Sequence, residues 1–120
     1  MSKFWGYHLI LDVAACDIES VTNGTKIAEF ARELVKKINM KAYGEPQVVH
    51  FADHDAEKAG YTLIQLIETS NITAHFCDID GNAYIDVFSC LQFDNEIVKQ
   101  VVTDYFNPKS IRETYLIRQA

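Results

Sequence analysis

Residues 61–90 read YTLIQLIETSNITAHFCDIDGNAYIDVFSC, three runs rich in branched and aromatic residues that are separated by turn residues. The runs at 61–67, 72–78 and 82–90 alternate between apolar and polar residues, which predicts half-buried β-strands. Residues 68–71 (ETSN) have the composition of a turn, and Asp80-Gly81 is a strong hairpin signal. The segment therefore predicts three consecutive antiparallel strands.

The flanking sequence adds two amphipathic helices and three further strands. Apolar residues at helical spacing predict one helix at 25–39, with Thr25 as its cap, and another at 94–105, capped by Asp94 or Asn95. Residues 17–24 are expected to form a polar connection, and strands are expected at 7–14, 47–51 and 110–118. Helices segregated from antiparallel strands predict an α+β fold, a two-layer α/β sandwich with a mainly antiparallel sheet and two helices on one face. We expect residues 1–120 to form a single domain.

Composition argues against several classes of function. The formal net charge is -6 and no basic stripe occurs, so no nucleic-acid partner is expected. The chain has no apolar run of about 18 residues and no signal peptide at its start, so we expect no membrane association and a cytoplasmic location. Three cysteines without a CxxC motif predict neither a disulfide framework nor a zinc site. We interpret the cluster His50, Asp53, His54 and Asp55 as a solvated loop, and no metal is expected.

The hairpin signal suggests how chemically active side chains come together. If Asp80-Gly81 is a two-residue loop, Cys90 lies opposite Asn71 and therefore beside Ser70, and His75 lies opposite Asp86. Each of these residues also has a plain structural interpretation, as a turn serine, a small core thiol and a hydrogen-bonded histidine. A hydrolase triad of Ser70, His75 and Asp86 is a further alternative, but the GxSxG motif of a nucleophile elbow is missing.

Residues 60–90 resemble the core of the prokaryotic S-adenosylmethionine decarboxylases. That family shows G-x-S-G, then E-S-H-x-[ST]-I-H-T-W-P-E, then V-D-V-F-T-C-G. The corresponding stretches here are GYTL at 60–63, ETSNITAHFCD at 68–78 and YIDVFSC at 84–90. The opening GYHLILD at 6–12, with Cys16-Asp17, also resembles the start of the family. The spacings from Ser70 to His75 and from His75 to Cys90 agree with the family without gaps.

The resemblance implies a self-processing enzyme. Ser70 would attack the carbonyl of Thr69, and elimination would cleave the chain between Thr69 and Ser70 and leave a pyruvoyl cofactor generated from Ser70. Thr62, at the position of the family's processing serine, would assist, and His75 would remove the proton during elimination. Cys90 would return a proton to the substrate carbon after CO2 leaves. The pyruvoyl carbonyl would form a Schiff base with the substrate amine and act as the electron sink.

Several positions depart from the family pattern. Thr69 stands where the family has Glu, Asn71 stands where it has His, and residues 76–79 (FCDI) replace T-W-P-E. The family's adenine-stacking aromatic falls near Ala56. Stacking by Phe51 or Tyr61, and ribose binding by Asp78, are the substrate contacts that we expect in their place.

The resemblance therefore predicts a pyruvoyl-dependent carboxy-lyase that acts on S-adenosylmethionine in polyamine and spermidine biosynthesis. One alternative is pyruvoyl-dependent decarboxylation of a basic amino acid such as ornithine or arginine, which the lost adenosyl motif and the acidic charge favour. Another is an uncleaved, non-catalytic homologue with a binding or regulatory role, which the changes at Thr69 and Asn71 favour. The family and the small size of the chain predict a homodimer or a dimer of dimers.

Overall fold

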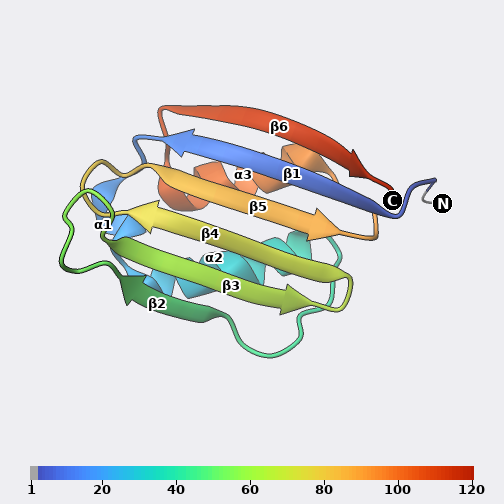
Figure 1. Cartoon of the computed structure of the whole chain (residues 1–120), viewed down its shortest axis with the longest axis horizontal. Helices are drawn as coiled ribbons and strands as arrows, with labels where there is room; N and C mark the ends of the chain where they lie inside the picture. Colours follow the sequence, from blue (N-terminus) through green and yellow to red (C-terminus); the bar gives the residue numbers. More distant parts are fainter. Residues whose placement is uncertain (1–2) are drawn as a thin grey trace.

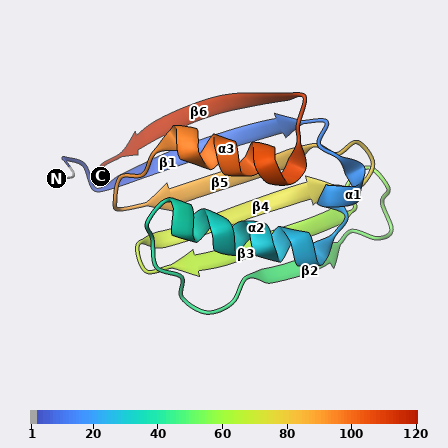
Figure 2. The same cartoon turned by 180° about the vertical axis from the view of Figure 1, so that it is seen from behind.

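The computed structural model describes residues 3–120 as one antiparallel sheet with helices on one side of it (Figure 1). The strands are β1 (Gly6–Ala14), β2 (Gln47–Phe51), β3 (Gly60–Ile67), β4 (Ser70–Cys77), β5 (Ala83–Ser89) and β6 (Ser110–Arg118), and the helices are α1 (Ile18–Val21), α2 (Gly24–Lys37) and α3 (Asn95–Phe106). The six strands lie in the order β2-β3-β4-β5-β1-β6. Figure 2 shows α2 and α3 side by side across one face. The predicted α+β fold, with two main helices on one face of an antiparallel sheet, is confirmed.

The core lies between the sheet and the two main helices, because each strand turns alternate side chains toward them. Ile72, Ala74 and Phe76 of β4 are buried on this side, whereas Asn71, Thr73 and His75 between them are only half-buried. Aromatic rings join the layers, since the ring centroid of Phe30 on α2 lies 4.9 Å from that of Phe106 on α3 and 6.4 Å from that of Phe76. Alternation along the strands thus leaves one face of the sheet packed and the other open.

Two local predictions about the helices were wrong. The polar connection expected at 17–24 contains the short helix α1, and α2 begins at Gly24, one residue earlier than predicted. The cap of α2 is Asn23, whose side chain accepts a hydrogen bond from the backbone N–H of Lys26 at 3.1 Å, so Thr25 already lies within the helix. Asp94 caps α3, as predicted, by accepting from the backbone N–H of Glu96.

The predicted β4–β5 register was wrong by two residues. The loop has four residues, 78–81, and is closed by a 2.8 Å hydrogen bond from the N–H of Cys77 to the carbonyl of Asn82. The side chain of Asp80 accepts from the N–H of Asn82, so Asp80-Gly81 occupies the end of the loop rather than all of it. Ser70 therefore pairs with Ser89, and His75 pairs with Tyr84 rather than with Asp86. A two-residue shift keeps every side chain on its predicted face.

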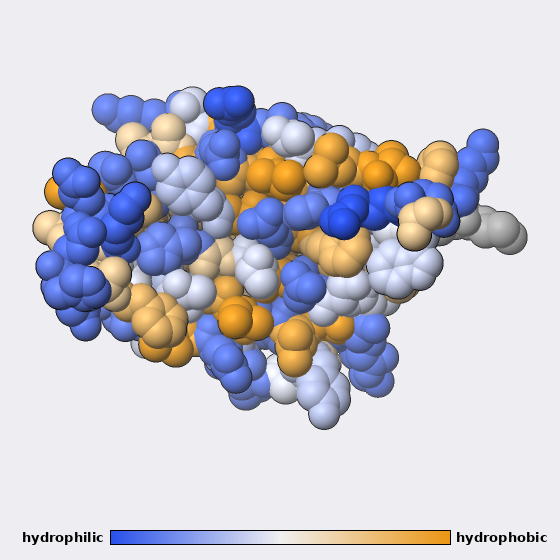
Figure 3. All heavy atoms as spheres, viewed as in Figure 1, coloured by the Kyte–Doolittle hydropathy of each residue, from blue (hydrophilic) through white to orange (hydrophobic). Residues whose placement is uncertain are grey.

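The open face of the sheet, on the side away from α2 and α3, carries exposed hydrophobic side chains among polar ones. Figure 3 looks onto this face and shows apolar patches along the sheet. The large exposed apolar residues that alternation places on it are Val49, Phe51, Ile64, Leu66, Tyr84 and Leu116. At its middle, the imidazole Nε2 of His8 lies 2.9 Å from the carboxylate of Asp86. Among residues 3–120, no helix combines the length and the apolar character that crossing a membrane requires.

Candidate active site

The turn between β3 and β4 has a strained backbone. Glu68 and Thr69 form the turn, and Ile67 pairs with Ser70 across it. Ser70 has a φ of 149°, a region that residues with a side chain rarely occupy. Among residues 3–120, the Ser70 hydroxyl has no hydrogen-bond partner. The strain therefore falls on the predicted cleaving serine, whose hydroxyl is free to attack.

The end of β5 holds Thr69 at both its backbone and its side chain. The backbone N–H of Cys90 donates to the carbonyl oxygen of Thr69 at 3.0 Å. The hydroxyl of Ser89 donates to Oγ1 of Thr69 at 2.8 Å and accepts from the N–H of Leu91 at 3.0 Å. Because Ser89 is fully buried, these bonds fix the Thr69–Ser70 peptide in one orientation. The Cys90 N–H is placed to stabilise negative charge on the Thr69 oxygen, as the donor of an oxyanion hole does.

His75 and Thr62 face each other on the open side of the sheet. They are directly paired between β4 and β3, and Nδ1 of His75 lies 3.0 Å from Oγ1 of Thr62. The other ring nitrogen, Nε2, lies 3.2 Å from the carbonyl oxygen of Lys58. A carbonyl only accepts, so Nε2 carries the proton. In the neutral imidazole, Nδ1 is therefore the basic nitrogen and accepts the Thr62 hydroxyl proton as a hydrogen bond.

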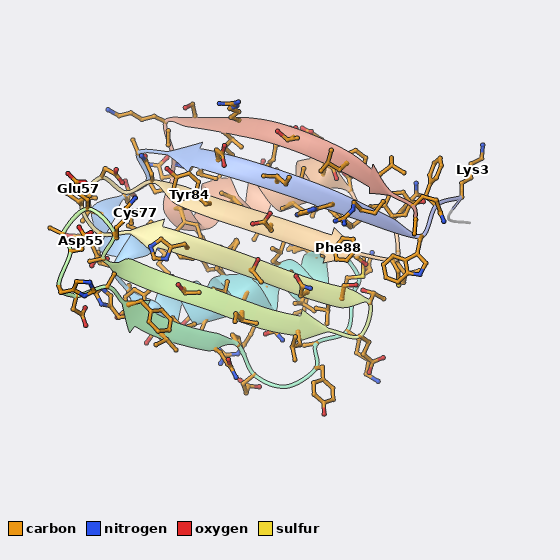
Figure 4. All side chains as sticks on the ribbon, in the orientation of Figure 1. Lys3, Asp55, Glu57, Cys77, Tyr84 and Phe88 are labelled. Carbon is orange, nitrogen blue, oxygen red and sulfur yellow. The ribbon has the colours of Figure 1, made fainter. Side chains whose placement is uncertain are left out.

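A hollow of about 620 Å³ adjoins His75 at this end of the sheet. Its lining residues are Glu57, Lys58, His75, Cys77, Ile79, Asp80 and Tyr84. Figure 4 shows Cys77 and Tyr84 beside the loop that carries Asp55 and Glu57, with Phe88 at the opposite end of the sheet. Burial, and then the charges of Asp80 and Asp78, raise the pKa of the Cys77 thiol, so this sulfur stays protonated. The hollow thus combines a base, a thiol and two carboxylates.

The predicted residues form two groups at opposite ends of β4. Thr69, Ser70 and Cys90 lie at its beginning, and Thr62 and His75 lie near its end. Ser70 and His75 are five residues apart in the sequence, which along an extended strand is about 17 Å. The structure therefore brings Ser70 to Cys90 and Thr62 to His75, but within one chain it does not bring Ser70 to His75.

The predicted substrate contacts lie on different faces. Phe51 ends β2 on the open face and is half exposed. Tyr61 points to the helix side, where its ring packs against Gly24 and lies 5.0 Å from the ring of His50. Asp78 is hydrogen-bonded to His50 at 2.6 Å. Of the three, only Phe51 therefore shares a face with Thr62 and His75.

The sequence did not predict the role of Ser89 in holding Thr69. Ser89 fits the alternation of its strand as any small inward-facing residue would. The available signal was a hydroxyl at a core position directly before Cys90. Within residues 3–120, no group of three or more His, Cys, Asp or Glu side chains is arranged to hold a metal ion.

The chain is similar to known proteins over most of its length. Residues 7–119 match the family model of S-adenosylmethionine decarboxylase. An S-adenosylmethionine decarboxylase proenzyme of Clostridium botulinum is 30% identical over 88 residues, which cover 73% of this chain and 71% of the relative. One of Clostridium kluyveri is 27% identical over 114 residues, covering 94% and 86%. The crystal structure of the adenosylmethionine decarboxylase of Aquifex aeolicus has the same fold, with a TM-score of 0.81, 23% identity and coverage of 99% and 94%.

Proposed function

The chain belongs to the S-adenosylmethionine decarboxylase family, and we propose that it is a self-processing, pyruvoyl-dependent decarboxylase that acts on S-adenosylmethionine in polyamine biosynthesis. The observation that carries the proposal is the held peptide between Thr69 and Ser70. Its carbonyl accepts from the Cys90 N–H at 3.0 Å, and its serine has a strained backbone. A turn that served only to reverse the chain would need neither feature.

The processing reaction begins with attack by the Ser70 hydroxyl on the carbonyl carbon of Thr69. The Cys90 N–H stabilises the oxyanion, the peptide C–N bond breaks, and residues 1–69 become an ester on the Ser70 oxygen. A base then removes the α-proton of Ser70, and the Cβ–O bond breaks to release the carboxylate of Thr69. The resulting dehydroalanine rearranges to an imine, and water replaces its nitrogen as ammonia. Residues 70–120 then begin with a pyruvoyl group.

His75 suits the role of this base, since its Nδ1 carries a lone pair and points at a hydroxyl. In its own chain, however, it is about 17 Å from Ser70 along the strand. A second copy resolves the separation. If two open faces pack with their β4 strands running in opposite directions, His75 of each copy lies over the end of the other copy's β4 that carries the Thr69–Ser70 peptide. Packed sheets lie about 10 Å apart, a gap that side chains from both faces can span.

The open face has the composition that such a dimer needs. Ile64 and Leu66 are 40% and 48% exposed, and both lie between the two residue groups that must meet. The twofold axis would pass near Thr73, midway along β4. Isologous contacts of this kind are the commonest way in which identical chains associate. We infer that the complete site is formed only in the homodimer.

In the decarboxylation reaction, the pyruvoyl group would supply an electron sink for the carbanion left when CO2 departs. It arises at residue 70, beside Cys90, whose partly exposed thiol would then donate a proton to the substrate carbon. Glu57 and Asp80 in the hollow beside His75 would attract the positive charges of the substrate. Phe51, Tyr61 and Asp78 remain predicted contacts of the adenosyl part.

A second candidate function is decarboxylation of a basic amino acid such as ornithine or arginine. Ile79 stands where the family pattern has an acidic residue, and it is 57% exposed at the edge of the hollow. The nearby carboxylates of Glu57 and Asp80 suit a guanidinium or an ammonium group equally well. Carbon dioxide release from S-adenosylmethionine, ornithine and arginine by the processed protein distinguishes the two candidates.

The first experiment is intact-mass spectrometry of the purified, denatured protein beside its Ser70→Ala variant. We expect two fragments from the wild type, with the 70–120 fragment lighter than its serine-terminated form by the mass of one ammonia, and an uncleaved variant. A wild-type chain that stays whole after long incubation would refute self-processing. The better account would then be a non-catalytic homologue with a binding or regulatory role.

A further inference from the structure

The imidazole of His50 lies between two carboxylates at the end of β2. Its Nδ1 is 2.5 Å from Oδ1 of Asp53, and its Nε2 is 2.6 Å from Oδ2 of Asp78. Ionised carboxylates only accept hydrogen bonds, so both ring nitrogens donate and the ring is an imidazolium. The hydrogen bond to Asp78, and then that to Asp53, raise the pKa of His50 above its usual value. The ring of Tyr61 on β3 is nearly perpendicular to the imidazole, with the two centroids 5.0 Å apart.

This His50 clamp, defined as His50 with Asp53 and Asp78, joins three separate segments. His50 is the second-last residue of β2, Asp53 belongs to the loop at residues 52–59, and Asp78 follows β4. The loop has its own backbone hydrogen bonds, from the N–H groups of Lys58 and Ala59 to the carbonyl of Asp55 at 3.0 and 2.8 Å. The N–H of Asp78 also donates to the carbonyl of Ala59 at 3.0 Å. The clamp and these bonds therefore hold the loop over the end of β4.

The held loop places the carbonyl of Lys58 against the ring of His75. This carbonyl accepts from Nε2 of His75 at 3.2 Å and so keeps Nδ1 unprotonated and turned to Thr62. We propose that His50 is a positioning residue that acts through the loop and the Lys58 carbonyl to fix the tautomer of His75. The role assigned to His75 rests on the proposed function, but its tautomer can be measured whether or not the protein is an enzyme.

Without the clamp, the hydrogen bonds that still join the loop to the end of β4 among residues 3–120 are the backbone bond from Asp78 to Ala59 and the bond between His75 and the Lys58 carbonyl. The Lys58 carbonyl would then move, and His75 would lose the acceptor that fixes its proton on Nε2. The imidazole would exchange between two tautomers, and in one of them Nδ1 would be a donor and no longer a base. The expected effect on chemistry is a lower rate of β-elimination.

The test is nitrogen-15 NMR of the imidazole rings in the uncleaved Ser70→Ala chain, where processing cannot alter the result. We expect His75 in this background to be a single Nε2–H tautomer, and the added His50→Gln substitution to produce a mixture. The matched control is His54→Gln on the same loop, because His54 makes no side-chain hydrogen bond to any of residues 3–120. An unchanged His75 tautomer in a folded His50→Gln chain would overturn the proposal.

A milder variant and a pH series guard against loss of folding. Asp53→Asn weakens only the link between the clamp and the loop, and it should shift the tautomer of His75 in the same direction as His50→Gln.

The charged groups that face His50 are the carboxylates of Asp53 and Asp78. They keep the imidazole of His50 protonated at pH values below its raised pKa, and this proton is lost as the pH rises through that pKa. Trypsin cleavage after Lys58 should therefore accelerate over that pH range in the Ser70→Ala chain, and it should be fast at every pH after His50→Gln. Cleavage that is equally slow with and without His50 would count against the clamp.

Discussion

Two inactive variants should restore each other if the active site forms between copies. A Ser70→Ala chain keeps His75, and a His75→Ala chain keeps Ser70. Within either chain the missing group cannot be replaced, because Ser70 and His75 are about 17 Å apart along β4. In a mixed dimer, one site combines the intact Ser70 of one chain with the intact His75 of the other, and the second site has neither. One complete site per mixed dimer is therefore expected.

The magnitude follows from random pairing. Equal co-expression places about half of the His75→Ala chains in mixed dimers, so about half of them should acquire the pyruvoyl group, and about a quarter of the wild-type decarboxylation should return. Mass spectrometry of the 70–120 fragment reads the first quantity, because the fragment carrying His75→Ala differs in mass from the wild type. Carbon dioxide release reads the second.

The matched control pairs Ser70→Ala with Cys90→Ala. Ser70 and Cys90 lie at the same end of the sheet in one chain, so no mixed dimer contains both at one site. Decarboxylation should not return in this mixture. If the Ser70→Ala and His75→Ala mixture also remained inactive while the chains were shown to associate, the proposed packing of the open faces would be refuted.

Three further predictions concern the residues that support the site. Ser89→Ala leaves the N–H of Leu91 without its acceptor. When it is added to the uncleaved Ser70→Ala chain, it should lower the free energy of unfolding by about 1–3 kcal/mol in chemical denaturation. In a chain that retains Ser70, the same substitution should slow processing. Ile64→Glu removes an apolar side chain from the proposed interface in each copy, which should cost about 3 kcal/mol of association free energy in total. The Kd of the dimer, measured by sedimentation, should therefore rise about a hundredfold. At mildly alkaline pH, iodoacetamide should label Cys90 before Cys77 and Cys16, because burial raises the pKa of both, that of Cys16 to about 11. Faster labelling of Cys16 than of Cys90 would contradict the burial that the structure shows.

The secondary structure was predictable because its signals are local. Buried and more exposed residues alternate along each of the strands β3 to β5, and this period of two can be recognised in the sequence without knowing which strand pairs with which. The register was less predictable, because Asp80-Gly81 fits both a two-residue loop and the end of the four-residue loop that forms. The side chain of Asp80 decides between them by accepting from the N–H of Asn82. The cap at Asn23 was missed for a similar reason, since Asn23 and Thr25 are both good capping residues.

The candidate site was only partly predictable, because its geometry depends on contacts between distant segments. The pairing of Thr62 with His75 follows once β3 and β4 are in register. The hold of Ser89 on Thr69 and the placement of the Lys58 carbonyl over His75 depend on where a strand end and a loop come to lie. No periodicity in the sequence reports either of them. The clamped His50 was visible only as one member of a polar cluster.

The five-residue spacing between Ser70 and His75 has a physical meaning in the proposed dimer, although the two residues are far apart within one chain. Five residues on a helix would bring two side chains to neighbouring turns, but on a strand they place the side chains near opposite ends of the sheet. A twofold axis near Thr73 converts that distance into contact, because it exchanges the two ends of β4. The spacing then measures twice the distance from the serine to the axis. Inserting or deleting one residue between Ser70 and His75 would shift this relation and turn His75 toward the core. A two-residue insertion would keep His75 on the open face and still misplace it by about 7 Å. We expect both changes to abolish processing, and a two-residue insertion that left it intact would exclude the proposed axis.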